Sequence, residues 1–198
     1  MDDRNIILVG MMATGKSTVG AILAEELDYE LIDLDAVITG REGRSIADIF
    51  ADGGEQAFRS IESEVLQEML QGERRVISTG GGAVLAPGNA EVMLEHGFVV
   101  ALTASEDTII ERVSGDENRP LLAGNAANRV RSILEQRREA YRFAHCTVDT
   151  TELNVAEVSQ YIFTALPRLS FLCVLALCIR MKLIPRWYRP TQSCRRSG

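Results

Sequence analysis

The chain has 198 residues, of which 46% are hydrophobic and 25% charged, so it resembles an average globular protein and not a disordered or fibrous one. This length suits one domain. The formal net charge of -7 argues against a general nucleic-acid binder, because such proteins need a basic surface.

Charged residues are distributed unevenly along the chain. All 28 Asp and Glu residues lie at or before Glu157, whereas seven of the 21 Lys and Arg residues lie from Arg168 onward. The tail also contains an apolar run, Leu169–Ile179, which is too short to span a membrane because a spanning helix needs about 20 residues. We therefore predict a folded domain over 1–167, and a basic, partly apolar tail over 168–198 that is dispensable for its activity.

The cysteines and the first residues indicate the compartment. Only Cys146 precedes the tail, and no pair of cysteines has the spacing of a zinc site or a disulfide framework. Asp2 and Asp3 come just before an apolar run, without the features of a signal or transit peptide. We expect a cytoplasmic protein, monomeric and without a membrane span, that acts on small molecules.

Short apolar runs alternate with helical patterns along the chain. The predicted strands are Asn5–Val9, Tyr29–Asp33, Val76–Ser78, Phe98–Leu102 and Cys146–Val148. Two predicted helices cover Ser45–Leu70 and Ala126–Phe143. The other four begin after Gly15, at Pro87, at a Ser105 cap, and at an Asn154/Glu157 capping box. This alternation predicts an α/β fold with a five-stranded parallel sheet and helices on both faces.

A phosphate-binding motif lies between the first strand and the first helix. The segment Gly10-Met11-Met12-Ala13-Thr14-Gly15-Lys16-Ser17 matches G-x-x-x-x-G-K-[ST] in the required context. Its backbone N–H groups turn toward phosphate oxygens, and the helix N-terminus adds partial positive charge. Lys16 is predicted to bridge the β- and γ-phosphates and Ser17 to bind Mg²⁺. Nucleotide hydrolases, switches and small-molecule kinases all share this motif.

Two carboxylates follow the second predicted strand. We place Asp33 and Asp35 at its carboxyl end, the edge where α/β folds bind ligands. Residues two apart on a strand face the same way, so one carboxylate can hold the Mg²⁺ shell while the other meets an acceptor hydroxyl. Helix capping explains these aspartates equally well on their own.

A predicted helix places Arg59 and Glu62 on one face. A plain surface ion pair is one interpretation. The other is an arginine that Glu62 braces for an anionic ligand, since a guanidinium matches a carboxylate with two parallel hydrogen bonds.

Three glycines follow Thr79 directly after the third strand. Gly80, Gly81 and Gly82 would let backbone N–H groups approach a ligand closely, although a flexible turn is the alternative. No acidic residue ends this strand, so Asp33 is the candidate to replace the usual Walker B aspartate.

Further cations lie in the second half of the chain. We interpret the polar stretch 114–125 as a lid whose Arg119 reaches the transferring phosphoryl group. Arg137 lies four residues before Tyr141, late in a predicted helix, and could add a second cation beside the substrate. Arginines on helix faces are usually solvated, so this pair alone is a weak signal.

Taken together and in order, these elements resemble the shikimate kinase family over about Asn5–Leu166. They are the phosphate loop, Asp33-Leu34-Asp35, Phe58-Arg59 with Glu62, Gly80–Gly82, Arg119-Pro120-Leu121-Leu122, and Arg137 with Tyr141. The resemblance implies a P-loop kinase fold of strand order 2-3-1-4-5. It also implies phosphoryl transfer from MgATP to the 3-hydroxyl of shikimate, giving shikimate 3-phosphate in aromatic amino-acid biosynthesis.

The resemblance assigns the acceptor side of the site to four residues. Asp35 would orient or deprotonate the attacking hydroxyl. Arg59, Arg137 and the amide of Gly81 would hold the carboxylate side of the ring.

The resemblance likewise assigns the nucleotide side. Lys16 and Arg119 would stabilise charge on the transferring group, while Ser17 would bind Mg²⁺ directly and Asp33 through water. Arg112 would flank the adenine. The implied ATP-binding residues are Ala13, Thr14, Gly15, Lys16, Ser17, Thr18, Arg112 and Arg119.

Two positions depart from the family pattern. Ala13 stands where the family usually has glycine, which would cost affinity if the position needs a positive φ. Leu153 stands where some members have an adenine-flanking arginine.

Two other functions stay open. One is another small-molecule kinase of the same fold, such as a gluconate kinase, which would not need two carboxylate-directed arginines. The other is a nucleotide-binding regulator that transfers no phosphate, against which the retained Lys16, Ser17, Asp33, Asp35 and Arg119 argue.

Overall fold

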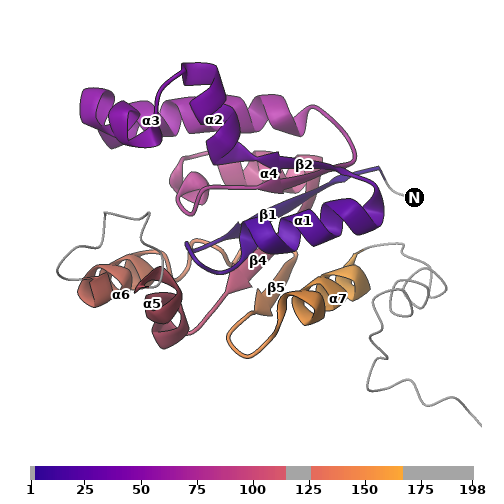
Figure 1. Ribbon diagram of the computed structural model, residues 1–198. Coiled ribbons are helices and arrows are strands. Elements are labelled where there is room, and N and C mark those ends of the chain that lie inside the picture. The colour runs from indigo at the N-terminus through magenta and orange to yellow at the C-terminus, as the bar shows by residue number, and fades with distance from the viewer. Residues whose placement is uncertain (1–2, 115–125, 167–198) are drawn as a thin grey trace, which may run out of the picture.

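A parallel sheet in the order β2-β3-β1-β4-β5 forms the centre of the computed structural model, which describes residues 3–114 and 126–166 (Figure 1). The strands are β1 Asn5–Gly10, β2 Glu30–Asp33, β3 Arg75–Ser78, β4 Gly97–Thr103 and β5 Cys146–Asp149. The predicted five strands and their order are confirmed. Residues 115–125 of the predicted lid, with Arg119, and the tail over 168–198 lie outside the described residues.

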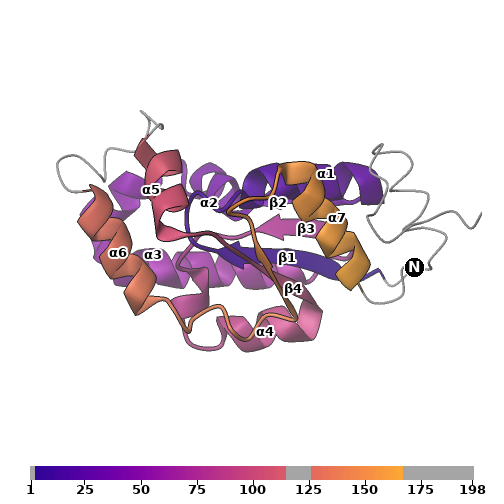
Figure 2. The ribbon, with the colours of Figure 1, turned by 90° about the horizontal axis from the view of Figure 1, so that it is seen from below.

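Helices cover both faces of the sheet, as predicted. The helical elements of the described residues are α1 Lys16–Leu27, α2 Leu34–Glu42, α3 Ile46–Leu70, η1 Ala83–Leu85, α4 Asn89–His96, α5 Glu106–Ser114, α6 Ala126–Gln136 and α7 Val155–Ala165. Figure 2 shows α1 and α7 on one face, α3 and α4 on the other, and α5 and α6 beyond the carboxyl ends of the strands. No helix in this part of the chain has the length and apolar character needed to cross a bilayer.

Alternate side chains of β1 pack into two separate apolar clusters. Ile7 and Val9 lie in the cluster formed with α3 and α4, whereas Ile6 and Leu8 lie in the one formed with α1 and α7. All four are at most 2% exposed, and burying each contributes about 1.5–3 kcal/mol. Burial on both faces explains why this strand is a continuous apolar run. The strand holds the phosphate loop at its carboxyl end.

The structure corrects one helix and adds another. Helix α6 ends at Gln136 and not near Phe143, because the following residues form turns that bring Tyr141 and Phe143 against the core. Helix α2 was not predicted. Only Leu34 and Ile38 of its nine residues are buried, too few to produce a clear helical period.

The predicted helix over Ser45–Leu70 is interrupted once. Ser45 forms a capping box with Asp48 at its start, but Gly54 has φ 71° and ψ -174°, which is not helical. The second part of α3 begins there and carries Arg59 and Glu62 toward the carboxyl end of the sheet.

Candidate active site

A cavity of about 520 Å³ opens at the carboxyl ends of the strands. It brings together most of the site residues predicted from the sequence: Ala13, Thr14, Gly15, Lys16, Ser17, Thr18, Asp33, Asp35, Gly81 and Arg112. Arg59 and Arg137 reach the same region through the glycine segment described below.

The phosphate loop connects β1 to α1. Lys16 Nζ donates to the carbonyl oxygens of Gly10 at 3.0 Å and Met11 at 2.9 Å, so the ammonium group lies across the loop. Gly15 has φ 93° and Ala13 has φ 62°. Position 13 therefore does require the left-handed conformation that glycine adopts freely and alanine adopts at a cost.

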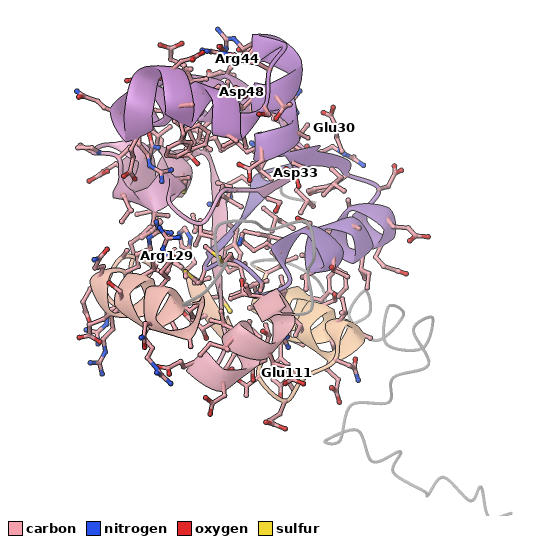
Figure 3. The ribbon with its side chains drawn as sticks, turned by 60° about the vertical axis from the view of Figure 1, so that its left-hand side comes forward. Glu30, Asp33, Arg44, Asp48, Glu111 and Arg129 are labelled. Carbon is pink, nitrogen blue, oxygen red and sulfur yellow. The ribbon has the colours of Figure 1, made fainter. Side chains whose placement is uncertain are left out.

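Asp33 performs two tasks at once. Its Oδ1 accepts a hydrogen bond from the Ala36 backbone N–H at 3.2 Å and caps α2, while its Oδ2 accepts one from Ser17 Oγ at 3.3 Å. Figure 3 shows Asp33 where β2 passes into α2. Asp33 can thus cap α2 and at the same time lie beside the Ser17 hydroxyl, the predicted Mg²⁺ ligand.

The placement of Asp35 on a strand is wrong. Strand β2 ends at Asp33, and Asp35 lies in the first turn of α2. The two carboxylates nevertheless line the same cavity. Asp35 Oδ1 lies so close to Gly80 that a β-carbon there would be 3.1 Å from it.

Arg59 and Glu62 are more than a surface pair. Arg59 Nη1 donates to Glu62 Oε2, and the Glu62 side chain is fully buried whereas that of Arg59 is 18% exposed. Arg59 also pairs with the exposed Glu55. Burial raises the pKa of Glu62, and the charge of Arg59 opposes that rise. The interpretation of an arginine braced by Glu62 is therefore favoured.

Two glycines of the Gly80–Gly82 run have very close neighbours. A β-carbon at Gly80 would lie 2.6 Å from Glu62 Oε1, and one at Gly82 would overlap the guanidinium of Arg59. At Gly81 it would lie 3.4 Å from the Met12 backbone nitrogen of the phosphate loop. Close approach therefore explains Gly80 and Gly82 better than turn flexibility does, whereas the contact at Gly81 is an ordinary one.

The last predicted pair converges on this segment. Arg137 Nη1 donates to the carbonyl oxygen of Gly81 at 3.0 Å, and Tyr141 Oη donates to the same oxygen at 2.6 Å. Burial raises the pKa of Tyr141, which keeps its hydroxyl protonated as a donor. Arg137 therefore lies beside Gly81, and it reaches it from a turn after α6 and not from the predicted helix.

Sequence reasoning missed Thr150, a polar residue of the cavity that follows β5. The Arg112 guanidinium reaches it from α5: Nη1 donates to Thr150 Oγ1 at 3.2 Å and Nη2 to the Thr150 carbonyl at 2.9 Å. Arg112 Nη1 also donates to the Ala13 carbonyl at 3.1 Å. Leu153 lines the same cavity. No local sequence pattern marks Thr150, since its partners lie in other elements.

The fold and the site define a P-loop kinase with a small-molecule acceptor. The strand order and the phosphate loop supply the nucleotide side, and the glycine run lies between two arginines and two carboxylates.

More narrowly, the chain belongs to the shikimate kinase family, whose model matches residues 12–167. The shikimate kinase of Geobacter sulfurreducens is 44% identical over 164 residues, covering 82% of this chain and 91% of the relative. The solved shikimate kinase from Acinetobacter baumannii in complex with shikimate is 38% identical, with a TM-score of 0.76 over 81% of this chain and 91% of that one. A gluconokinase from Sinorhizobium meliloti 1021 is 20% identical, with a TM-score of 0.52 over 91% of this chain and 96% of that one, and shares the fold alone.

Proposed function

We propose that this protein transfers the γ-phosphoryl group of ATP to the 3-hydroxyl of shikimate. The observation that carries the proposal is the position of the glycine run. Its three residues approach the carboxylates of Asp35 and Glu62, the backbone of the phosphate loop, and the guanidinium groups of Arg59 and Arg137. A small hydroxy acid bound there would face the nucleotide, with its carboxylate near the cations.

The acceptor residues take separate roles in this proposal. Arg59, Arg137 and the amide of Gly81 hold the carboxylate side of the ring. Asp35 orients the 3-hydroxyl and accepts its proton as the oxygen attacks the γ-phosphorus. The bond from this phosphorus to the bridging oxygen breaks, and ADP leaves. Asp35 and Gly81 line the cavity, and Arg59 and Arg137 lie against the adjoining glycines Gly82 and Gly81, which supports the assignment.

The nucleotide side is assigned in the same way. Lys16, together with Arg119, stabilises charge on the transferring group. The proposed contacts to ATP are Ala13, Thr14, Gly15, Lys16, Ser17, Thr18, Arg112 and Arg119.

Two residues are suited to hold Mg²⁺. The hydroxyl of Ser17 and the carboxylate of Asp33 are hard oxygen donors that already meet at 3.3 Å. Within the described residues no group of three or more His, Cys, Asp or Glu side chains forms a metal cage. Mg²⁺ usually binds through one or two protein oxygens, phosphates and water. In our proposal Ser17 binds the ion directly and Asp33 through water, and the bound ion neutralises phosphate charge.

A coupled assay of ADP release tests the proposal. We expect turnover with ATP and shikimate, none with gluconate as acceptor, and loss of turnover when Mg²⁺ is chelated. Turnover with gluconate would favour a related sugar-acid kinase. Nucleotide binding without turnover on either acid would favour a regulator. A monomeric state and a cytoplasmic location stay predictions, which gel filtration and cell fractionation would check.

A further inference from the structure

Thr150 connects three elements through one hydroxyl group. Its Oγ1 lies 3.3 Å from the carbonyl oxygen of Thr14 in the phosphate loop and 3.0 Å from that of Thr103 at the end of β4. Arg112 Nη1, from α5, lies 3.2 Å from the same Oγ1. The residue is only 3% exposed, so water does not easily replace these partners.

The direction of each hydrogen bond follows from the chemistry of the groups. A guanidinium only donates, so the Thr150 oxygen accepts from Arg112 and has one proton to give. The Thr103 carbonyl already receives the backbone N–H of Thr150 at 2.8 Å. The Thr14 carbonyl at 3.3 Å and the Thr103 carbonyl at 3.0 Å both lie within reach of the hydroxyl proton, and of the two only the Thr14 carbonyl belongs to the phosphate loop.

Holding this carbonyl also orients the next N–H group. A trans peptide is planar, with its C=O and N–H pointing in opposite directions. When Thr150 holds the Thr14 carbonyl, the Gly15 N–H is directed the other way. Arg112 does the same for the preceding peptide, because it donates to the Ala13 carbonyl at 3.1 Å. Phosphate loops bind anions through N–H groups aligned in this manner.

We propose that Thr150 is a positioning residue of the nucleotide site. Its hydroxyl, which Arg112 polarises, holds the Thr14–Gly15 peptide so that the Gly15 N–H points at the phosphates of the nucleotide. The inference rests on the proposed function only in that the loop binds a nucleotide. It also explains how this loop keeps its shape with an alanine at φ 62°.

Thr150→Val tests the hydroxyl alone, because valine has nearly the same shape. We expect its affinity for MgADP, measured by calorimetry, to fall about tenfold, the effect of weakening one hydrogen bond to a charged oxygen. The affinity for AMP, which lacks the β-phosphate, should stay unchanged. Thr150→Ser keeps the hydroxyl and should restore MgADP binding. Should Thr150→Val fail to fold, Thr150→Ala carries the same expectation.

Thr151→Val is the matched control. The Thr151 hydroxyl bonds to the Asp149 carboxylate and accepts from the Ser105 N–H, which lie outside the phosphate loop. Unchanged MgADP affinity in Thr150→Val, equal losses for ADP and AMP, or the same loss in Thr151→Val would each overturn the inference. Failure of the wild-type protein to bind MgADP would instead refute the proposed nucleotide site.

Discussion

The hydroxyl of Ser17 donates to Oδ2 of Asp33 at 3.3 Å, although one residue lies in the first turn of α1 and the other ends β2. The second carboxylate oxygen, Oδ1, caps α2. A single side chain therefore connects the phosphate loop to the element that carries Asp35. Substitution of Asp33 can separate the effect of its charge from the effect of its capping oxygen.

Asp33→Asn keeps a capping oxygen but removes the charge. Asparagine caps helices as well as aspartate does, so the free energy of unfolding should change by less than about 0.5 kcal/mol. The Mg²⁺ concentration for half-maximal velocity should rise about tenfold, as for other residues that orient metal ligands. Asp33→Ala, which also removes the cap, should lose about 1 kcal/mol of stability. An unchanged Mg²⁺ dependence in Asp33→Asn would remove Asp33 from the metal site.

Glu62 should make stability depend on pH. Because burial raises its pKa above the ordinary value of 4.5, the folded protein holds this proton to a higher pH than the unfolded chain does. The contribution of Glu62 to the free energy of unfolding therefore falls as pH rises from 4.5 through the folded-state pKa. Glu62→Gln lacks this effect. Its stability relative to the wild type should thus increase over that window and then level off.

Urea denaturation at several pH values measures this difference. Glu55→Gln, which removes the exposed carboxylate partner of Arg59, is the control for loss of an ion pair. A difference between Glu62→Gln and the wild type that stays constant, or that decreases with pH, would contradict the raised pKa.

Gly82→Ala should impair the acid substrate selectively. The added β-carbon overlaps the end of the Arg59 side chain, which is flexible and moves before the backbone does. We expect near wild-type stability, an unchanged KM for ATP, and a KM for shikimate raised about tenfold or more by the misplaced guanidinium. Gly40→Ala, in α2 with no atom within 4 Å of the new β-carbon, should leave both KM values unchanged. A selective rise in the KM for ATP would argue against the role of Arg59.

Ala13→Gly should stabilise the protein slightly. The left-handed conformation costs alanine about 1–2 kcal/mol, while the greater freedom of glycine in the unfolded chain costs about 0.5–1 kcal/mol. A net gain of about 0.5 kcal/mol in the free energy of unfolding is expected. Ala51→Gly, at an exposed position in α3, should instead lose about 1 kcal/mol. Equal losses in both variants would show that Ala13 is not strained.

Local sequence patterns were sufficient to predict the sheet and the phosphate loop. Each central strand is an apolar run because it is covered on both faces, and the loop motif is contiguous in sequence. The strand placement of Asp35 failed because α2 begins immediately after Asp33, and its short buried face produces little periodicity.

Contacts between distant residues limited the prediction of the site. Arg137 and Tyr141 meet Gly81 across 56 and 60 residues, and the turn that brings them there interrupts an apolar pattern that continues to Phe143. Thr150 depends on partners in the phosphate loop, β4 and α5. Such convergence is a property of the tertiary fold and has no signature in neighbouring residues.

The shared acceptor at Gly81 has a consequence for the proposed binding of the acid substrate by Arg137. Before any acid arrives, Arg137 already rests on a neutral oxygen, so much of its rotational freedom is lost in advance. An incoming anion attracts the guanidinium more strongly than that oxygen does. When the Arg137 guanidinium turns from the carbonyl to the anion, the Tyr141 hydroxyl still donates to the Gly81 carbonyl oxygen. The Gly81 carbonyl therefore keeps a hydrogen-bond donor after the exchange. The Arg137 guanidinium is ordered before the acid binds, and little opposes its release from the carbonyl.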